Sequence, residues 1–502
     1  MLAKVKSMTV IGLDAEVIDV EVDLSNGLPC FNIVGLPDKA VEEAKERVKS
    51  AIKNSGGLFP QKRITVNLAP ADIKKEGPSF DLPIALGILA AAGQIEFDTE
   101  NTVSVGELSL DGKLRRVNGV LPISMAAKKK GYKEIFVPKA NAKEAAIVEG
   151  ADVLPVDSLK NLMLYLRKEK DIKKMKNVKV DFSNEESYLD MAHVKGQEHA
   201  KRALEIAASG GHNILMSGSP GSGKTLLAKT LTTILPNLTF DESLEVSKIY
   251  SITGALPKEK ALITSRPFRN PHHTASSIAL VGGGQWPRPG EISLAHRGVL
   301  FLDEMPEFPR SVIEILRQPL EDGTVTISRA NGTLSFPANF VLVAAQNPCP
   351  CGYLNDPVKN CSCSPGQIIK YQKKVSGPIL DRIDLHIDVP RVETDKLTSD
   401  SRSESSENIK KRVEKAREIQ AKRFKGTSKV TNSEMTSSDI KEYCKLSKES
   451  LELLKSAIER LYLSARSYTK ILKIARTIAD LDESSNIKSQ HIAEALQYRP
   501  KS

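Results

Sequence analysis

The sequence predicts a multidomain α/β protein with an α+β domain at 1–166, a linker at 167–189, a P-loop α/β core at 190–392 and a helical domain at 393–502. Three observations lead to this prediction. A phosphate-binding loop pattern stands between a strand pattern and a helix pattern at 212–235, strand-like and helical runs alternate before it, and helical periodicities follow it. A chain of 502 residues is long enough for about three domains with full cores.

Charge and hydropathy restrict the class of protein. The net charge of +10 suits a polyanionic partner, although a merely basic protein would carry the same charge. The longest apolar stretch, 82–92, contains Pro83 and is too short to cross a bilayer, so we expect no membrane partner. No signal-peptide pattern opens the sequence, and the cytoplasm is therefore the expected compartment.

The first domain combines strands with helices. Alternating apolar runs predict strands at 9–11, 18–24, 31–34 and 63–68, and longer periodic runs predict helices at 38–55 and 80–92.

Part of this first domain resembles the Lon-type Ser-Lys protease domain, on the segments 75–79, 105–112 and 131–138. The resemblance implies that Ser79 stands where that family has its nucleophile. An ungapped alignment places Leu121 at the position of the lysine base. A serine without a base is a weak nucleophile, so we interpret Ser79 as a turn residue without peptidase activity. Lys113 and Lys128 are the alternatives for a shifted dyad.

The phosphate-binding loop matches G-x-x-x-x-G-K-[ST]. It consists of Gly218, Ser219, Pro220, Gly221, Ser222, Gly223, Lys224 and Thr225. Glycines let such a loop wrap a polyphosphate with its N–H groups pointing inward at a helix N-terminus. Lys224 would meet the β and γ phosphates of ATP, and Thr225 would take a Mg²⁺ position.

Two further strands end in polar residues. The apolar run 299–302 is followed by Asp303 and Glu304, and the run 340–346 is followed by Asn347. Because ligands bind at the carboxyl ends of parallel strands, we expect Asp303 to hold Mg²⁺ through water and Glu304 to orient the attacking water.

Several segments resemble elements of AAA+ ATPases: 194–206 beside the adenine, Asn347 as sensor 1, 377–384 and 464–466. The resemblance implies that Asn347 helps to position the hydrolytic water.

The same resemblance assigns roles to two arginines. Arg382 would reach the γ-phosphate of a neighbouring subunit, where the spread charge of the transition state needs a further cation. An internal pair with Asp384 is the alternative. Arg466 would act as sensor 2, and Arg476 is its competitor.

Five segments together resemble the magnesium-chelatase-like AAA+ proteins of the YifB/ComM type, namely 266–274, 282–284, 288–295, 316–322 and 347–352. Those proteins share the Lon-like front domain. The resemblance implies a homo-hexameric ring ATPase that acts on single-stranded or branched DNA as a branch-migration helicase in natural transformation, with recombination proteins as further partners. The alternatives are an ATPase subunit of a metal-insertion complex and an ATP-dependent protease.

Two basic elements are candidates for DNA contact. The segment 320–337 predicts a β-hairpin insert with an Asn-Gly turn at 331–332, and Arg329 would face a phosphate backbone if the hairpin lined a pore. A surface hairpin is the alternative. A helix expected at 408–424 carries Lys411 and Arg412, which would contact DNA or form an ordinary solvated face of a lid helix.

The cysteines and two histidines are the remaining candidate ligands. Four cysteines form two C-x-C pairs in the loop 349–363, at Cys349, Cys351, Cys361 and Cys363. They predict a structural Zn²⁺ site, with free thiols or disulfides as alternatives. Cys30 and Cys444 are interpreted as packing residues. His272 and His273 are adjacent, which favours hydrogen bonding in a loop over metal binding.

Overall fold

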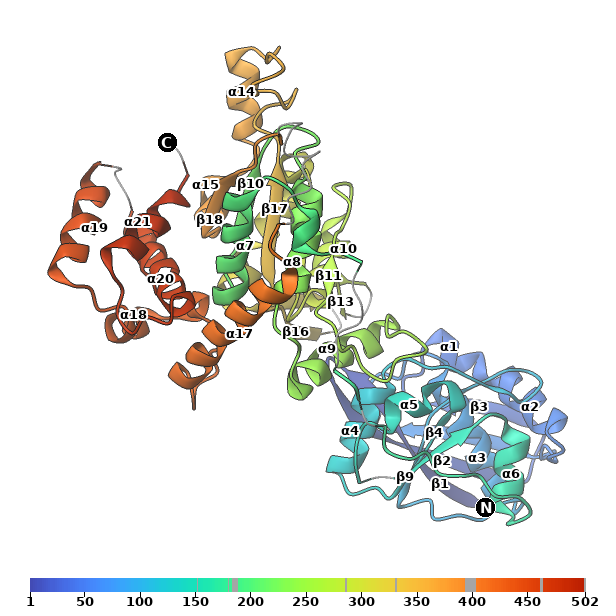
Figure 1. Cartoon of the computed structure of the whole chain (residues 1–502). Coiled ribbons are helices and arrows are strands. Elements are labelled where there is room, and N and C mark those ends of the chain that lie inside the picture. Colours follow the sequence, from blue (N-terminus) through green and yellow to red (C-terminus); the bar gives the residue numbers. More distant parts are fainter. Residues whose placement is uncertain are drawn as a thin grey trace. The chain divides into compact units, whose positions relative to one another are not determined.

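The computed structural model describes residues 1–150, 152–178, 180–182, 188–284, 287–329, 332–392, 403–460 and 464–500. These residues form two compact units, shown together in Figure 1. The first unit contains 1–181 and 239–264, and the second contains 182–238 and 265–502. The predicted multidomain α/β fold is confirmed, since each unit is built on its own sheet.

The first unit is built on a seven-stranded mixed sheet in the order β3-β4-β2-β1-β5-β8-β9. Its longest strands, β1 (Leu2–Ile11) and β2 (Asp14–Ser25), pair as an antiparallel hairpin. The other strands are shorter, and β6 and β7 form a separate two-stranded ribbon. Their bounds are β3 (Cys30–Val34), β4 (Arg63–Ala69), β5 (Thr102–Ser104), β6 (Glu107–Leu108), β7 (Leu114–Arg115), β8 (Glu134–Pro138) and β9 (Asp152–Val156). All four predicted strands lie within β1 to β4.

Helices cover this sheet. They are α1 (Lys39–Glu42), α2 (Ala44–Asn54), α3 (Asp81–Ala91), α4 (Val120–Lys129), α5 (Ala142–Ala145) and α6 (Leu159–Leu166). The helix predicted at 38–55 is interrupted at Glu43, so it forms α1 and α2. Almost all of α3 is buried, and at Gly87 an added Cβ would lie 2.5 Å from the Cγ2 atom of Val22. Glycine at this position therefore allows α3 to approach the sheet closely.

One helix from the middle of the chain belongs to the first unit. Helix α9 (Phe240–Thr253) packs against α4, although its residues lie within the range expected for the core. The hydroxyl of Ser251 donates to the buried carboxylate of Glu144 at 2.5 Å, and the Ser251 carbonyl accepts the N–H of Gly119 at 3.0 Å. The segment 239–264 is thus an integral part of the first unit's packing.

The second unit is built on a five-stranded sheet in the order β11-β14-β17-β10-β18, in which every neighbouring pair is parallel. The carboxyl ends of all five strands therefore meet at one edge. The strands are β10 (Ile214–Ser217), β11 (Phe268–Arg269), β14 (Val299–Leu302), β17 (Val341–Gln346) and β18 (Leu385–Asp388). The helices within this sequence range are α7 (Glu198–Gly210), α8 (Lys224–Ile234), α10 (Ser277–Val281), α11 (Glu291–Leu294), α12 (Arg310–Ile315), α13 (Arg317–Asp322), α14 (Pro365–Gln372) and α15 (Gly377–Leu380).

Two small antiparallel ribbons stand outside the main sheet of the second unit. One pairs β12 (Gly282–Gly283) with β13 (Arg288–Pro289). The other, β15 (Thr324–Arg329) with β16 (Gly332–Pro337), is the predicted hairpin. Residues 330 and 331, which connect the two strands, lie outside the described residues. The Asn-Gly turn therefore stays a prediction.

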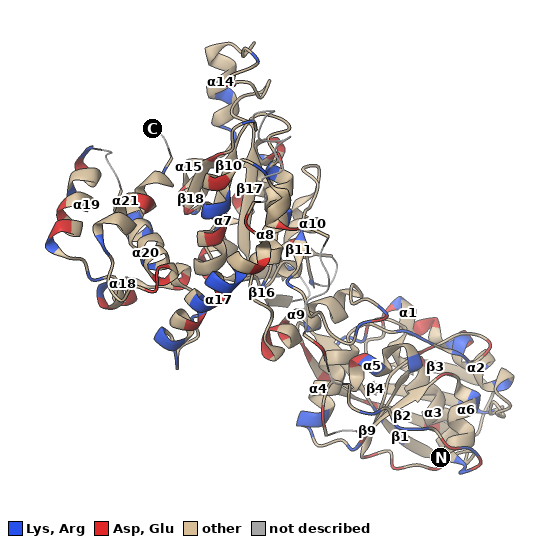
Figure 2. Ribbon diagram, in the orientation of Figure 1, with Lys and Arg blue, Asp and Glu red and all other residues tan. Residues whose placement is uncertain are grey.

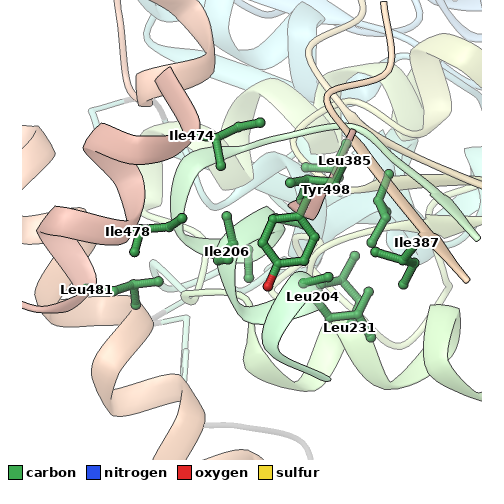
Figure 3. Close-up of a cluster of buried hydrophobic side chains, with 14 of the residues drawn as sticks. Leu204, Ile206, Leu231, Leu385, Ile387, Ile474, Ile478, Leu481 and Tyr498 are labelled. Carbon is green, nitrogen blue, oxygen red and sulfur yellow. The ribbon is translucent and has the colours of Figure 1, made fainter. Parts of the chain in front are cut away.

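Among the residues described after this sheet, the helices are α17 (Ser406–Arg423), α18 (Ser437–Tyr443), α19 (Lys448–Arg460), α20 (Ala465–Leu481) and α21 (Ser489–Gln497). Figure 3 shows that they share one apolar core with the sheet, because Ile474, Ile478 and Tyr498 pack among side chains such as Leu204 and Leu385. No helix among the described residues is long and apolar enough to cross a membrane.

Candidate functional site

The predicted phosphate-binding loop connects β10 to α8, as its sequence context requires. Gly221 and Gly223 adopt positive φ values of 78° and 92°, which glycine reaches without steric cost. An added Cβ at either glycine would meet no atom of the described residues within 4 Å. At Gly218, by contrast, a Cβ would lie 2.2 Å from the carbonyl oxygen of Val389. The loop therefore packs against the end of β18 at Gly218. At Gly221 and Gly223 it borders open space, and we call this open side of the loop the cradle.

The Lys224 ammonium lies inside this loop. It donates to the carbonyl oxygens of Gly218 at 2.7 Å and Ser219 at 3.0 Å, and to Oδ1 of Asn347 at 3.3 Å. Burial lowers the pKa of Lys224 from its usual range, against the opposing effect of Asp303 and Glu304. Asn347 directly follows β17, which lies between β10 and β14, so the predicted sensor residue and the loop lysine are in direct contact.

The two acids lie at the end of β14. Thr225 Oγ1 donates to Oδ2 of Asp303 at 2.8 Å, which brings together the two predicted Mg²⁺ residues. Glu304 has a φ of 52°, a left-handed conformation that is uncommon for residues other than glycine. Such a backbone conformation ends the extended course of the chain that follows β14. The hydroxyl, carboxylate, ammonium and N–H groups of this cradle fit Mg²⁺ and a nucleotide triphosphate.

His273 is a site residue that sequence reasoning missed. Its Nδ1 atom lies 3.6 Å from Oε2 of Glu304, and its ring is 4.1 Å, centroid to centroid, from that of His272. His272 itself forms a hydrogen bond with the hydroxyl of Thr274 at 2.8 Å, as expected for a loop histidine. The sequence did contain a signal for His273. Both histidines follow strand β11 by a few residues, and β11 lies beside β14 in the parallel sheet.

The two predicted arginines converge on one carboxylate, that of Glu321. Arg382 Nη2 lies 2.6 Å from Glu321 Oε1, and the Arg466 guanidinium contacts the same oxygen. Together they lower the pKa of Glu321, with Arg382 as the larger contribution. Asp384, the alternative partner of Arg382, instead faces Lys470 and His212. The pairing of Arg382 with Glu321 was not foreseen, because Glu321 lies on α13, far from Arg382 in sequence.

Arg476, the competitor of Arg466, is buried. It donates to Asp480 and to the carbonyl oxygens of Ser484 and Ser485, so it stabilises the end of α20. Arg466 lies in the first turn of α20 after the N-cap residue Ser464, and its side chain is 48% exposed. Of the two arginines, Arg466 is the accessible one.

The three DNA-contact candidates differ in their surroundings. Arg329 is exposed near the end of β15, and its guanidinium would lie 3.1 Å from a Cβ added at Gly283. Arg412 pairs with Glu205 and Glu404, each at 2.5 Å, and Lys411 pairs with Glu407. The apolar residues Ile409, Val413 and Ala416 of α17 are buried.

Along α17, acidic residues are interspersed among a larger number of basic residues (Figure 2). The helix packs on α7 and α8, which is the behaviour expected of a helix of the domain itself. Contact of Lys411 or Arg412 with DNA remains a prediction.

The four cysteines of the loop 349–363 form one cluster, and their sulfur atoms all lie within 4.8 Å of one another. Three Sγ–Sγ distances are 3.4, 3.6 and 3.7 Å, longer than the roughly 2.05 Å of a disulfide. Backbone N–H groups of Tyr353 and Ser362 lower the pKa of Cys351 to about 5. The cluster is a candidate metal centre, while Cys444 is buried elsewhere and Cys30 is exposed.

Ser79 has no lysine beside it among the contacts of the described residues. Leu121, at the position of the family's base, is fully buried in an apolar cluster. Lys113 pairs with Asp111 at 3.1 Å, and Lys128 lies beside Gly150. Among the described residues, neither alternative lysine forms a hydrogen bond with Ser79, and the absence of peptidase activity stays a prediction.

Comparisons with known proteins agree with this site. Family models for "Magnesium chelatase, subunit ChlI", "Subunit ChlI of Mg-chelatase" and "Magnesium chelatase, subunit ChlI C-terminal" match residues 190–397, 20–141 and 403–499. The chain is 46% identical to Competence protein ComM of Haemophilus influenzae, over 99% of this chain and 97% of that protein. It is 43% identical to the uncharacterized protein YifB of Escherichia coli, over the same shares.

A further likeness covers part of the chain. Lon protease 2 of Bacillus subtilis is 33% identical over 116 residues, which are 23% of this chain and 20% of that protein. This is the expected resemblance to the Lon-type domain. Together with the full-length matches and the assembled phosphate-binding site, it shows that the chain belongs to the magnesium-chelatase-like AAA+ family of ComM and YifB.

Proposed function

We propose that this protein is a ring-shaped ATPase that moves along DNA, and that its role is branch migration in recombination or natural transformation. The observation that carries the proposal is the meeting of Lys224, Thr225, Asp303 and Asn347 at one sheet edge in a full-length relative of a competence protein.

The nucleotide chemistry follows from the residues at that edge. Mg²⁺ bound with ATP would supply neutralisation of the charge on the phosphates. Lys224 would bind the phosphates, Thr225 and Asp303 would hold the ion, and Glu304 would orient the attacking water. Asn347 is a positioning residue for that water, and His273 positions the Glu304 carboxylate through their 3.6 Å contact.

We infer that a ring of subunits supplies a second cation at this sheet edge. Phosphoryl transfer gains greatly from a second cation on the γ-phosphate, beyond the loop lysine. Arg382 and Arg466 are both engaged with Glu321 on their own chain. We propose that Arg382 leaves Glu321 to reach the nucleotide of the neighbouring subunit, so that six subunits complete one another's sites.

We also propose that the four cysteines of the loop 349–363 bind Zn²⁺.

Two features support the proposal that the protein binds DNA, namely its net charge and the hairpin formed by β15 and β16. The net charge of +10 favours phosphate contacts, and Arg329 stands exposed near the end of β15. Aligned in a ring, six such hairpins would place a circle of arginines around a strand.

The direct test is the ATPase rate with no DNA, duplex, single-stranded and branched DNA, measured for the wild type and Glu304→Gln. We expect branched or single-stranded DNA to stimulate the wild type several-fold. The Glu304→Gln protein should bind ATP and DNA but turn over little, because its water is not oriented. An absence of DNA binding at low salt, where phosphate contacts are strongest, would exclude the DNA motor.

A second test addresses the ring. Glu304→Gln and Arg382→Ala subunits should each be inactive alone. Mixed, they should regain part of the activity, because some interfaces then combine an intact Glu304 with an intact Arg382. An Arg382→Ala protein that hydrolyses ATP at the wild-type rate would contradict the shared site.

The descriptions of the family models favour a second candidate, the ATPase subunit of a metal-insertion complex. It would hydrolyse ATP with the same residues. The same DNA panel separates the two, because a metal-insertion ATPase has no reason to respond to branched DNA.

A further inference from the structure

The four-cysteine cluster has the dimensions of a tetrahedral metal site. With a Zn–S bond of about 2.3 Å, the sulfur atoms of a tetrahedron lie about 3.8 Å apart. The distances from Cys349 Sγ to Cys351 Sγ and Cys361 Sγ are 3.4 and 3.7 Å, and that from Cys351 Sγ to Cys361 Sγ is 3.6 Å. Backbone N–H groups point at the sulfurs, including that of Cys351 at Cys363 Sγ and that of Cys363 at Cys361 Sγ, both 3.4 Å. Such N–H groups favour thiolates, the form that binds metal.

The loop that carries the four cysteines is connected to the region of Asn347 at both of its ends. Cys349, which is buried, follows Asn347 by two residues. At the other end, Cys363 precedes the capped start of α14, at Ser364. That helix returns to the strand end, because Gln372 Nε2 donates to the carbonyl oxygen of Pro348 at 3.3 Å. Joining the two C-x-C pairs therefore closes the loop between α14 and Asn347, the residue that contacts Lys224.

The same loop packs directly on the phosphate-binding loop. An added Cβ at Gly352 would lie 2.5 Å from Cδ and 2.7 Å from Cγ of Pro220. Asp356 of the same loop accepts the N–H groups of Val358 and Lys359 at Oδ1, at 2.9 and 3.0 Å, and its pKa lies below its usual range because of the Ser219 side chain and these N–H groups. The cysteine loop thus supports the open cradle from the side of residues 219 and 220.

We propose that a Zn²⁺ ion held by Cys349, Cys351, Cys361 and Cys363 braces the nucleotide site, so that the rate of ATP hydrolysis depends on metal occupancy. The ion joins the two C-x-C pairs, and the joined loop fixes Asn347 and the outer edge of the phosphate-binding loop. The proposal rests on the ATPase activity but not on DNA. It makes these cysteines part of the support of the catalytic site.

Metal binding is tested on the full-length protein. Elemental analysis should find a single zinc ion per chain, and Co²⁺ exchanged into the protein should give the visible bands of a tetrahedral thiolate site. Removal of the metal with a mercurial and chelator, followed by release of the mercurial with thiol, should lower the DNA-free ATPase rate by at least about tenfold, as expected when catalytic groups shift by about an ångström. Added Zn²⁺ should restore it. Absence of bound metal, or an undiminished rate in metal-free protein, would overturn the proposal.

A second variant tests the brace without touching a ligand. Gly352→Ala places its Cβ against Pro220 at a residue with a φ of 83°, while Gly366→Ala on α14 adds a Cβ that meets no described atom within 4 Å. Both proteins should keep zinc and the Co²⁺ spectrum. Gly352→Ala should lose at least about tenfold in kcat, and Gly366→Ala should match the wild type. Equal rates in the two variants would overturn the brace even if removal of the metal unfolds the protein.

Replacement of a ligand gives a further arm. Cys363→Ser should lose zinc and turnover, Cys363→His should retain both because imidazole is also a zinc ligand, and Cys30→Ser should change neither. Loss of turnover in the His variant with its metal retained would contradict the proposal. Failure of DNA to stimulate ATP hydrolysis would overturn the proposed motor alone, because every measurement here is made without DNA.

Discussion

The buried carboxylate of Asp384 provides a quantitative test of how the helical region is attached to the nucleotide core. Its Oδ1 lies 3.4 Å from Lys470 Nζ on α20, and its Oδ2 lies 3.4 Å from His212 Nδ1 at the start of β10. Burial opposes ionisation, yet Lys470 and His212 hold the pKa of Asp384 well below its usual range. Asp384→Asn keeps the shape of the side chain but leaves Lys470, 12% exposed, without its counter-charge.

The cost of that substitution follows from burial. Removing one partner of a buried ion pair costs about 3 kcal/mol or more. Since about 1.4 kcal/mol corresponds to a tenfold change in an equilibrium constant, amide exchange along α20 should accelerate about a hundredfold at neutral pH. Native-state hydrogen exchange followed by mass spectrometry measures this opening segment by segment. Peptides of the first unit serve as the internal control and should not change.

The double variant Asp384→Asn with Lys470→Met removes both charges and should recover much of the lost protection. The pH dependence has a defined sign. Because the folded pKa of Asp384 is below the unfolded value of about 4, its stabilisation is present above that value and is lost as pH falls through the folded pKa. The wild type should therefore lose more protection in acid than the variant does. Unchanged exchange in Asp384→Asn, or a double variant no better than the single one, would refute the reasoning.

Three further predictions concern single side chains. His273→Ala should lower kcat by roughly ten- to a hundredfold with little change in KM for ATP, because the Glu304 carboxylate loses its neighbour; equal kcat values would show that the contact is incidental. Ser79→Ala should leave ATPase activity unchanged and remove no casein-degrading activity, and a peptidase activity lost in this variant would revive the Ser-Lys dyad. Glu321→Gln should remove two partly exposed ion pairs, with Arg382 and Arg466, which contribute about 1 kcal/mol or less to stability. Amide hydrogen exchange in the first turn of α20 should therefore rise only about threefold. A much larger rise would show a structural role for Glu321.

Local sequence was sufficient for the parts of the fold with strong periodicity. The strand, loop and helix around Lys224 were predictable because the glycines, the apolar run before them and the helical run after them all occur in one continuous segment. The acids after β14 were predictable for the same reason. The predicted helix 38–55 was interrupted at Glu43, where Asp38 caps only the first short helix by accepting the N–H of Val41.

Contacts between distant segments could not be predicted from local patterns. Nothing near Ser251 indicates that its hydroxyl meets Glu144, since that contact depends on α9 packing with the first unit. Glu321 likewise shows no local sign of holding Arg382. The contact of His273 with Glu304 follows from the order of strands in the sheet, which a single sequence does not specify.

Branch migration itself is the most direct measure of the central claim. The substrate is a labelled four-way DNA junction whose arms can be resolved into two duplexes only by movement of the branch point. The wild type with ATP should convert the junction to duplexes, whereas Lys224→Ala and the wild type with a non-hydrolysable ATP analogue should leave it intact. A wild-type protein that binds the junction and hydrolyses ATP, yet leaves the branch point unmoved at every salt concentration tested, would contradict the proposed motor.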